Sequence, residues 1–156
     1  MRLNKLAAVV AGSLTITITG CSTPTSDETV PASKSAVGEV LRFTTGEVSI
    51  EVTIDEDNPA TRDLVDLVPF TVRLEDFNGR EKIADLPREL NYTGSPGSAP
   101  VDGDLIYYIP WGNIGFYYNT GGIGYSDQTL HLGTYDATIE QLERLEGQAV
   151  TVEVVN

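Results

Sequence analysis

Aromatic side chains gather in one stretch in the second half of the chain. The group consists of Tyr107, Tyr108, Trp111, Phe116, Tyr117, Tyr118 and Tyr125. Strand alternation would send neighbouring tyrosines to opposite faces, so we expect half of the group in the core and half at the surface. An exposed aromatic surface can stack on a proline ring or another flat apolar ligand, the alternative being packing against the neighbouring loops. We predict that the ligand contacts are Trp111, Tyr108, Phe116 and Tyr117.

The titratable residues suggest little further chemistry. His131 is the only histidine, no Gly-x-Ser-x-Gly segment supplies a nucleophile, and alternation with Leu130 and Leu132 predicts that the imidazole points to solvent. The acidic run 55–57 lacks the spacing, the glycine and the later glutamate of a calcium loop, so a solvated turn before a helix is expected there. We predict no metal site and no cofactor.

The single cysteine, Cys21, closes an apolar run of residues 6–18, after Arg2 and Lys5 and directly after the small pair Thr19-Gly20. This is the layout of a secretory signal peptide. It resembles the lipobox of bacterial lipoproteins, in which the cysteine takes a diacylglycerol and becomes the new N-terminus. The alternative is an ordinary signal peptide with an incidental cysteine. The resemblance implies a lipoprotein with acyl chains such as palmitate on Cys21, bound to the cell membrane and facing outside the cytoplasm.

Composition divides the chain into three parts. Residues 1–20 are the predicted signal peptide, residues 21–37 a Ser-, Thr- and Pro-rich disordered tether, and residues 38–156 the folded domain. Removing residues 1–20 leaves eight basic residues against 23 acidic ones, a net charge of about −15. So negative a surface repels nucleic acid, which we exclude as a partner, and membrane attachment must come from the lipid.

The domain reads as mainly β. Strict alternation over residues 47–54 predicts a half-buried strand that pairs with residues 40–44, and similar patterns predict strands at 70–74, 81–86, 105–109, 114–118, 130–132 and 150–154. Asn58-Pro59 and Asp136 are predicted starts of two short helices, which end before Pro69 and at Gly147. We therefore predict a closed antiparallel β-barrel with the two helices covering its ends.

Three segments carry a family resemblance. These are residues 76–83 with Leu86-Pro87-Arg88, residues 103–113 with their Tyr-Tyr and Pro-Trp-Gly motifs, and Leu132-Gly133. Together they are similar to a bacterial family of cyclophilin-like domains, and the resemblance runs from about Gly38 to the C-terminus. It implies the cyclophilin β-barrel with two capping helices.

Catalytic cyclophilins isomerise X-Pro bonds with an arginine beside a pocket for the proline ring. Their Phe-His-Arg and Gln-Gly-Gly segments are absent here, and Arg73 is only a weak catalytic candidate beside Arg80 and Arg88. The function we expect is therefore non-enzymatic binding of a peptide or small molecule by a lipid-anchored module. The alternatives are a peptidyl-prolyl isomerase acting on exported proteins and a purely structural surface protein.

Overall fold

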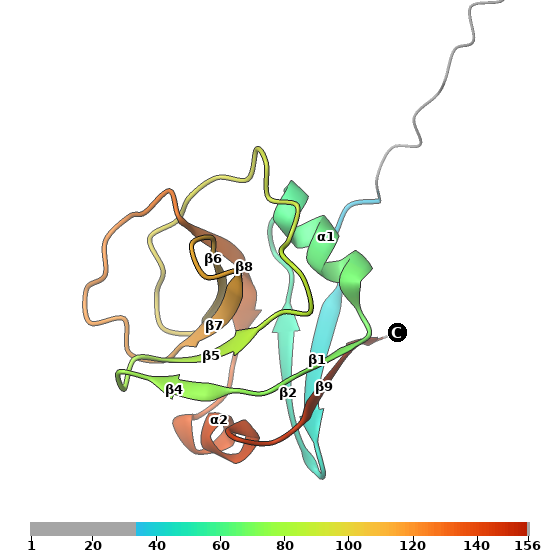
Figure 1. Ribbon diagram of the computed structural model, residues 1–156, viewed down its shortest axis with the longest axis vertical. Coiled ribbons are helices and arrows are strands. Elements are labelled where there is room, and N and C mark those ends of the chain that lie inside the picture. Colours follow the sequence, from blue (N-terminus) through green and yellow to red (C-terminus); the bar gives the residue numbers. More distant parts are fainter. Residues whose placement is uncertain (1–33, 156) are drawn as a thin grey trace, which may run out of the picture. The chain divides into compact units, whose positions relative to one another are not determined.

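The structure is a computed structural model that describes residues 34–155, and these residues form nine strands and two helices (Figure 1). The signal peptide and Cys21 lie outside the described residues, as does the tether up to residue 33. The helices are α1 (Pro59–Leu67) and α2 (Ile139–Leu145). The strands are β1 (Val40–Thr45), β2 (Val48–Thr53), β3 (Phe70–Val72), β4 (Glu75–Phe77), β5 (Glu81–Asp85), β6 (Asp104–Tyr108), β7 (Asn113–Tyr117), β8 (Thr129–Tyr135) and β9 (Val150–Val155).

All nine strands belong to one antiparallel sheet. Their order is β3-β9-β1-β2-β8-β6-β7-β5-β4, and the sheet curls into a half-barrel (Figure 1). The predicted hairpin of β1 and β2 is confirmed, since Thr45 pairs with Val48 around the turn, and β9 pairs with the other side of β1. Alternation along these strands turns Leu41, Phe43 and Val52 into the concave side, where they are fully buried.

The prediction of a closed barrel is wrong. The two end strands, β3 and β4, are not hydrogen-bonded to each other; β3 pairs only with β9, and β4 only with β5. Both are three residues long, and they are consecutive pieces of one run of chain that crosses from one sheet edge to the other. Between them the Leu74 carbonyl accepts a hydrogen bond from the Gly147 N–H, at 2.8 Å. Because the run continues from β3 into β4 without a hairpin turn, the two strands do not lie side by side, and hydrogen bonding does not close the sheet (Figure 1).

The concave side of the sheet holds the core, with the two helices packed at different strands. Edge-to-face contacts join the Phe116 ring to Phe43, with centroids 5.0 Å apart, and to Tyr135, at 5.3 Å. Helix α1 packs against β8 and α2 against β2. The middle strands β6 and β7 carry two of the predicted ligand contacts, Tyr108 and Tyr117, on their other face.

The helix starts follow capping chemistry. Asn58 is the N-cap of α1, as predicted: its side-chain oxygen accepts from the Thr61 N–H, and Thr61 caps in return. For α2 the predicted cap, Asp136, is wrong. Thr138 is the N-cap and forms a capping box with Gln141, because a threonine three residues before a glutamine satisfies two free N–H groups at once.

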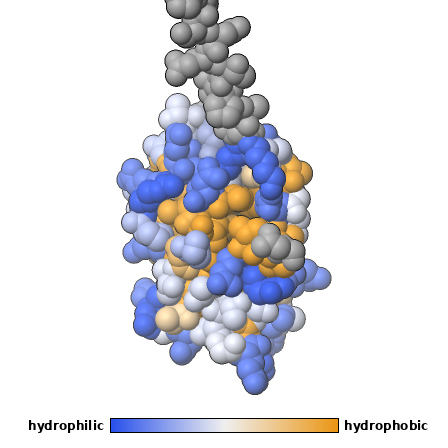
Figure 2. Space-filling model, turned by 90° about the vertical axis from the view of Figure 1, so that its right-hand side faces the viewer, coloured by the Kyte–Doolittle hydropathy of each residue, from blue (hydrophilic) through white to orange (hydrophobic). Residues whose placement is uncertain are grey.

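Packing begins slightly before the predicted domain boundary at residue 38. Ala36 is buried, and its N–H donates to the Asp57 carboxylate at 3.2 Å. On the face that carries α1 and β9, hydrophobic surface is bordered by hydrophilic side chains (Figure 2). Val65 and Val154 line a hollow of about 380 Å³ there with Ala36. Within residues 34–155, no helix is both long enough and apolar enough to cross a bilayer.

Candidate functional site

The convex face of strands β4 to β7 carries most of the predicted ligand contacts. Residues paired across neighbouring strands point to the same face, so the strand register places these side chains in rows. The rows are Phe77, Glu81 and Tyr117; then Ile83, Gly115 and Ile106; then Asp85, Asn113 and Tyr108. Because Gly115 has no side chain, the middle row leaves a hollow at its centre.

A cavity of about 260 Å³ occupies this hollow, and we call it the aromatic cavity. Its lining residues are Phe77, Glu81, Ile83, Ile106, Tyr108, Trp111, Asn113, Tyr117, Ile123 and Thr129. Three of the four predicted contacts, Tyr108, Trp111 and Tyr117, are thus brought together. Phe116 is not among them: it is fully buried on the opposite face, since it alternates with Tyr117, and it supports the cavity from the core.

Trp111 is held firmly although 55% of it is exposed. It lies in the turn between β6 and β7, where its backbone N–H donates to the Tyr108 carbonyl at 3.3 Å. Its ring meets Phe77 and Tyr108 edge to face, with centroids 5.3 Å apart in each pair. These contacts fix the indole at the rim of the cavity, with its remaining surface open to a ligand.

Glu81 places a carboxyl group inside the cavity. The residue is only 9% exposed, and a Cβ atom on Gly115 would lie 2.2 Å from its Oε2 atom. The carboxyl group therefore lies directly over Gly115. Burial raises the pKa of Glu81, and burial beside this carboxylate raises the pKa of Tyr117 to about 12.

Sequence reasoning missed Glu81, Phe77, Asn113 and Ile123 as lining residues. Glu81 and Phe77 lie beside Tyr117 only because of the order and register of β4, β5 and β7, which a single sequence does not show. One signal was present: Gly115 interrupts an otherwise bulky strand, which often marks close approach by another group. Ile123 comes from the Gly-rich loop 121–124, which covers one side of the cavity.

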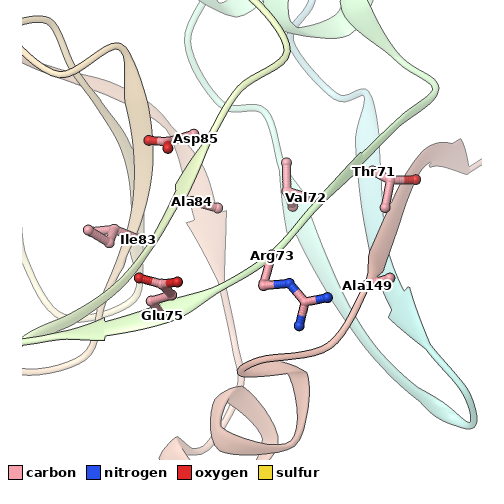
Figure 3. Close-up of a pocket in the computed structure, with 8 residues that line it drawn as sticks. All are labelled: Thr71, Val72, Arg73, Glu75, Ile83, Ala84, Asp85 and Ala149. Carbon is pink, nitrogen blue, oxygen red and sulfur yellow. The ribbon is translucent and has the colours of Figure 1, made fainter.

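Arg73, the weak catalytic candidate, lies elsewhere. It lines a pocket of about 400 Å³ between the two sheet edges, which we call the edge pocket. Figure 3 shows Val72 and Arg73 on one run of chain and Ile83, Ala84 and Asp85 on the other. The Arg73 guanidinium donates to the Gly147 carbonyl. An arginine thus stands in a pocket lined by both charged and apolar residues, and none of the described residues that line it is aromatic.

His131 is less exposed than predicted. Only 14% of its side chain is exposed, because its Nε2 atom lies 2.7 Å from Asp55, while Nδ1 lies 3.6 Å from Asp104. The expectation of an imidazole pointing into solvent is therefore wrong. Within residues 34–155, no three histidine, cysteine or carboxylate side chains are grouped so that they could hold a metal ion.

The sequence and the fold of this chain are similar to those of known proteins. The model of the Cyclophilin-like family matches residues 43–155. The fold is similar to the solution structure of a hypothetical protein from Archaeoglobus fulgidus, with a TM-score of 0.54 and 21% identity. That match covers 77% of this chain and 96% of the archaeal one, and at such identity it concerns the fold alone. No curated protein matches the chain.

Proposed function

Because this chain belongs to the Cyclophilin-like family, we propose that its domain is a non-enzymatic module that binds a peptide or small ligand in the aromatic cavity. Since one fold hosts many functions, we infer the function from the site and not from the family. The observation that carries it is the hollow over Gly115, lined by Tyr108, Trp111 and Tyr117. A mostly apolar cavity with a few polar groups is the usual form of a ligand site.

Trp111 makes the proposal easy to test, because it is the only tryptophan and stands at the rim of the cavity. Small aromatic compounds and blocked proline dipeptides are titrated while tryptophan fluorescence is recorded. A binding ligand should shift the emission saturably. The Tyr108→Leu variant should bind roughly fivefold more weakly, since one aromatic contact is worth about 1 kcal/mol.

Tyr125→Leu is the matched control, because Tyr125 is an exposed tyrosine outside the cavity lining. It should leave the titration unchanged. The proposal is abandoned if no compound changes the fluorescence, or if both tyrosine variants weaken binding equally.

A second candidate function, peptidyl-prolyl isomerisation, is favoured by one observation: Arg73 stands beside Val72 and Ala84 in the edge pocket (Figure 3). A cationic group near a twisted amide can lower its rotation barrier of about 20 kcal/mol. A protease-coupled assay on a proline peptide tests this. If the domain is an isomerase, it should accelerate isomerisation of the peptide, and Arg73→Ala should abolish this acceleration. The control Arg144→Ala, which changes an exposed arginine of α2, should keep it.

The module is held at the outer side of a membrane through acyl chains on Cys21. The support for this part of the proposal is the order of residues before the cysteine, a positive segment, an apolar run and the small pair Thr19-Gly20. Two acyl chains give stable anchoring, whereas one alone binds only weakly. The binding cavity would then be presented outside the cytoplasm.

A further inference from the structure

The carboxyl group of Glu81 is buried without a cationic partner. Among residues 34–155, no lysine or arginine nitrogen lies within 4.0 Å of its oxygens. The next residue, Lys82, points to the other face of β5, where it contacts Asp76 at 2.8 Å and Glu146 at 2.7 Å. Buried carboxylates are normally paired, so a carboxylate that lines an open cavity without a cation is a site for one.

The other residues that line the aromatic cavity also favour a cation. The rings of Phe77, Tyr108, Trp111 and Tyr117 all line it, and the face of an aromatic ring attracts a cation through its quadrupole. Arg80, which precedes Glu81 in the chain, is not its counter-ion, since the Arg80 guanidinium donates to the Thr120 carbonyl at 2.8 Å. Aromatic rings around a carboxylate favour organic cations over neutral or anionic groups.

The size of the cavity and the net charge of the chain limit which ligands can bind there. The cavity of about 260 Å³ is smaller than the roughly 300–1,000 Å³ of sites for drug-sized ligands, so it fits one small group or one side chain. The chain has a net charge of −13, which raises the local concentration of cations around the protein.

We infer that the aromatic cavity recognises a guanidinium or alkylammonium group of its ligand, with Glu81 as the counter-ion and the aromatic rings around the cation. The inference rests on the proposed function, because it names the class of ligand that the same cavity binds. The cation is carried either by a free small molecule or by an arginine or lysine side chain of a peptide.

The test compares ligands that differ only in charge. N-acetylarginine methylamide and its neutral isostere, N-acetylcitrulline methylamide, are titrated separately against the full folded chain, with Trp111 fluorescence as the readout. We expect the arginine compound to bind at least ten times more tightly than the citrulline compound. Methylguanidinium alone forms a third arm: saturable binding points to a free small cation, and binding only of the blocked arginine points to a peptide side chain.

Variants then locate the effect. Glu81→Gln keeps the shape of the side chain but removes its charge, and it should lower the affinity for the arginine compound at least tenfold. Glu153→Gln, which removes an exposed carboxylate on β9, should not change the affinity. Circular dichroism checks the fold of both variants. If Glu81→Gln does not fold, the ratio of arginine to citrulline affinity on the unaltered chain decides.

Four results would overturn the inference. Equal affinity for the arginine and citrulline compounds would show that charge is not recognised, although the cavity would still be a ligand site. Binding of the arginine compound that Glu81→Gln does not weaken would show that the cation lies elsewhere. If neither compound binds while a neutral aromatic compound from the earlier screen does, the inference fails and the proposed function stands. If no compound of either set binds, both fail.

Discussion

At the scale of single residues, the site depends on Gly115 as much as on the aromatic side chains. Every neighbour of this glycine on the convex face carries a side chain, so the missing one creates the hollow that Glu81 partly fills. The aromatic residues could be picked out from the sequence because alternation separates Tyr107 from Tyr108. The role of Glu81 could not be predicted from the sequence, because it depends on which residues of the neighbouring strands lie opposite Glu81.

Replacing Gly115 by alanine should abolish ligand binding at modest cost in stability. The new Cβ would meet the Glu81 carboxyl group at 2.2 Å, but that group is the end of a flexible side chain and can move away. We expect a loss of about 1 kcal/mol in the free energy of unfolding, measured with urea, because a small added group forces a local shift. Fluorescence titration with the best ligand should show no saturable change.

The control for this variant is Gly124→Ala, since nothing lies within 4 Å of a Cβ atom at that position. Unchanged ligand affinity in Gly115→Ala would mean that the ligand does not occupy the aromatic cavity.

A second residue-scale prediction concerns Lys82, a buried cation near the ring of Tyr118. Its hydrogen bond to Asp76, together with one from the Tyr118 hydroxyl, lowers the pKa of Asp76 from 3.8 to about 2. A carboxylate with a lowered pKa stabilises the fold above pH 4, and this contribution disappears as the pH falls toward 2. Lys82→Met should cost about 2 kcal/mol near neutral pH, the usual value for hydrogen bonds to charged groups.

The variant should also lose less stability than the unaltered chain between pH 4 and pH 2, because without Lys82 the pKa of Asp76 lies closer to its ordinary value. Urea unfolding at several pH values measures both effects. Lys34→Met, which removes an exposed lysine paired with Glu39, serves as control. Parallel pH profiles for the unaltered chain and Lys82→Met would rule out this coupling.

At the scale of elements, alternation predicted most strands, and capping chemistry predicted the start of α1. Neither pattern could predict how the two edges of the sheet are arranged. Strands β3 and β4 look like parts of a barrel wall, yet they are one crossing run whose bonds to Gly147 were invisible in the sequence. The ends of the sheet are short, as protein edge strands often are, and this limits unwanted pairing with other chains. The cap of α2 was misplaced because Asp136 and Thr138 both suit that role.

Helix α1 also anchors the long loop 91–103. The side-chain oxygen of Asn58 accepts from the Thr61 N–H and from the Ser95 hydroxyl, each at 3.1 Å. Asn58→Ala should therefore lower the free energy of unfolding by about 1–2 kcal/mol, the usual range for a lost N-cap. It should also make the loop easier to cleave in limited proteolysis.

Asn58→Asp keeps the accepting oxygen, and it should retain most of the stability and the resistance to cleavage. Equal loss in both variants would mean that the cap is not what holds this region.

At the scale of the whole molecule, we propose that the half-barrel is carried at a membrane surface by lipid on Cys21, with a binding cavity on its convex face. Cys21→Ser should release the protein from the membrane, because an acidic chain has no electrostatic attraction to anionic lipid. In detergent phase separation of cell extracts, the unaltered chain should enter the detergent phase and the variant the aqueous phase. Its mass should lack acyl groups. An unaltered chain that is found in the aqueous phase without lipid would refute the anchoring.

The aromatic cavity is the central claim, and nuclear magnetic resonance of the ¹⁵N-labelled domain tests it most directly. In a titration with N-acetylarginine methylamide or the best ligand of the screen, each backbone amide and the Trp111 indole N–H report separately. The account predicts that the largest saturable shifts cluster at Trp111, Asn113, Gly115 and Tyr117. Shifts that cluster instead at Arg73 and Ala84 in the edge pocket, or no saturable shifts at all, would contradict it.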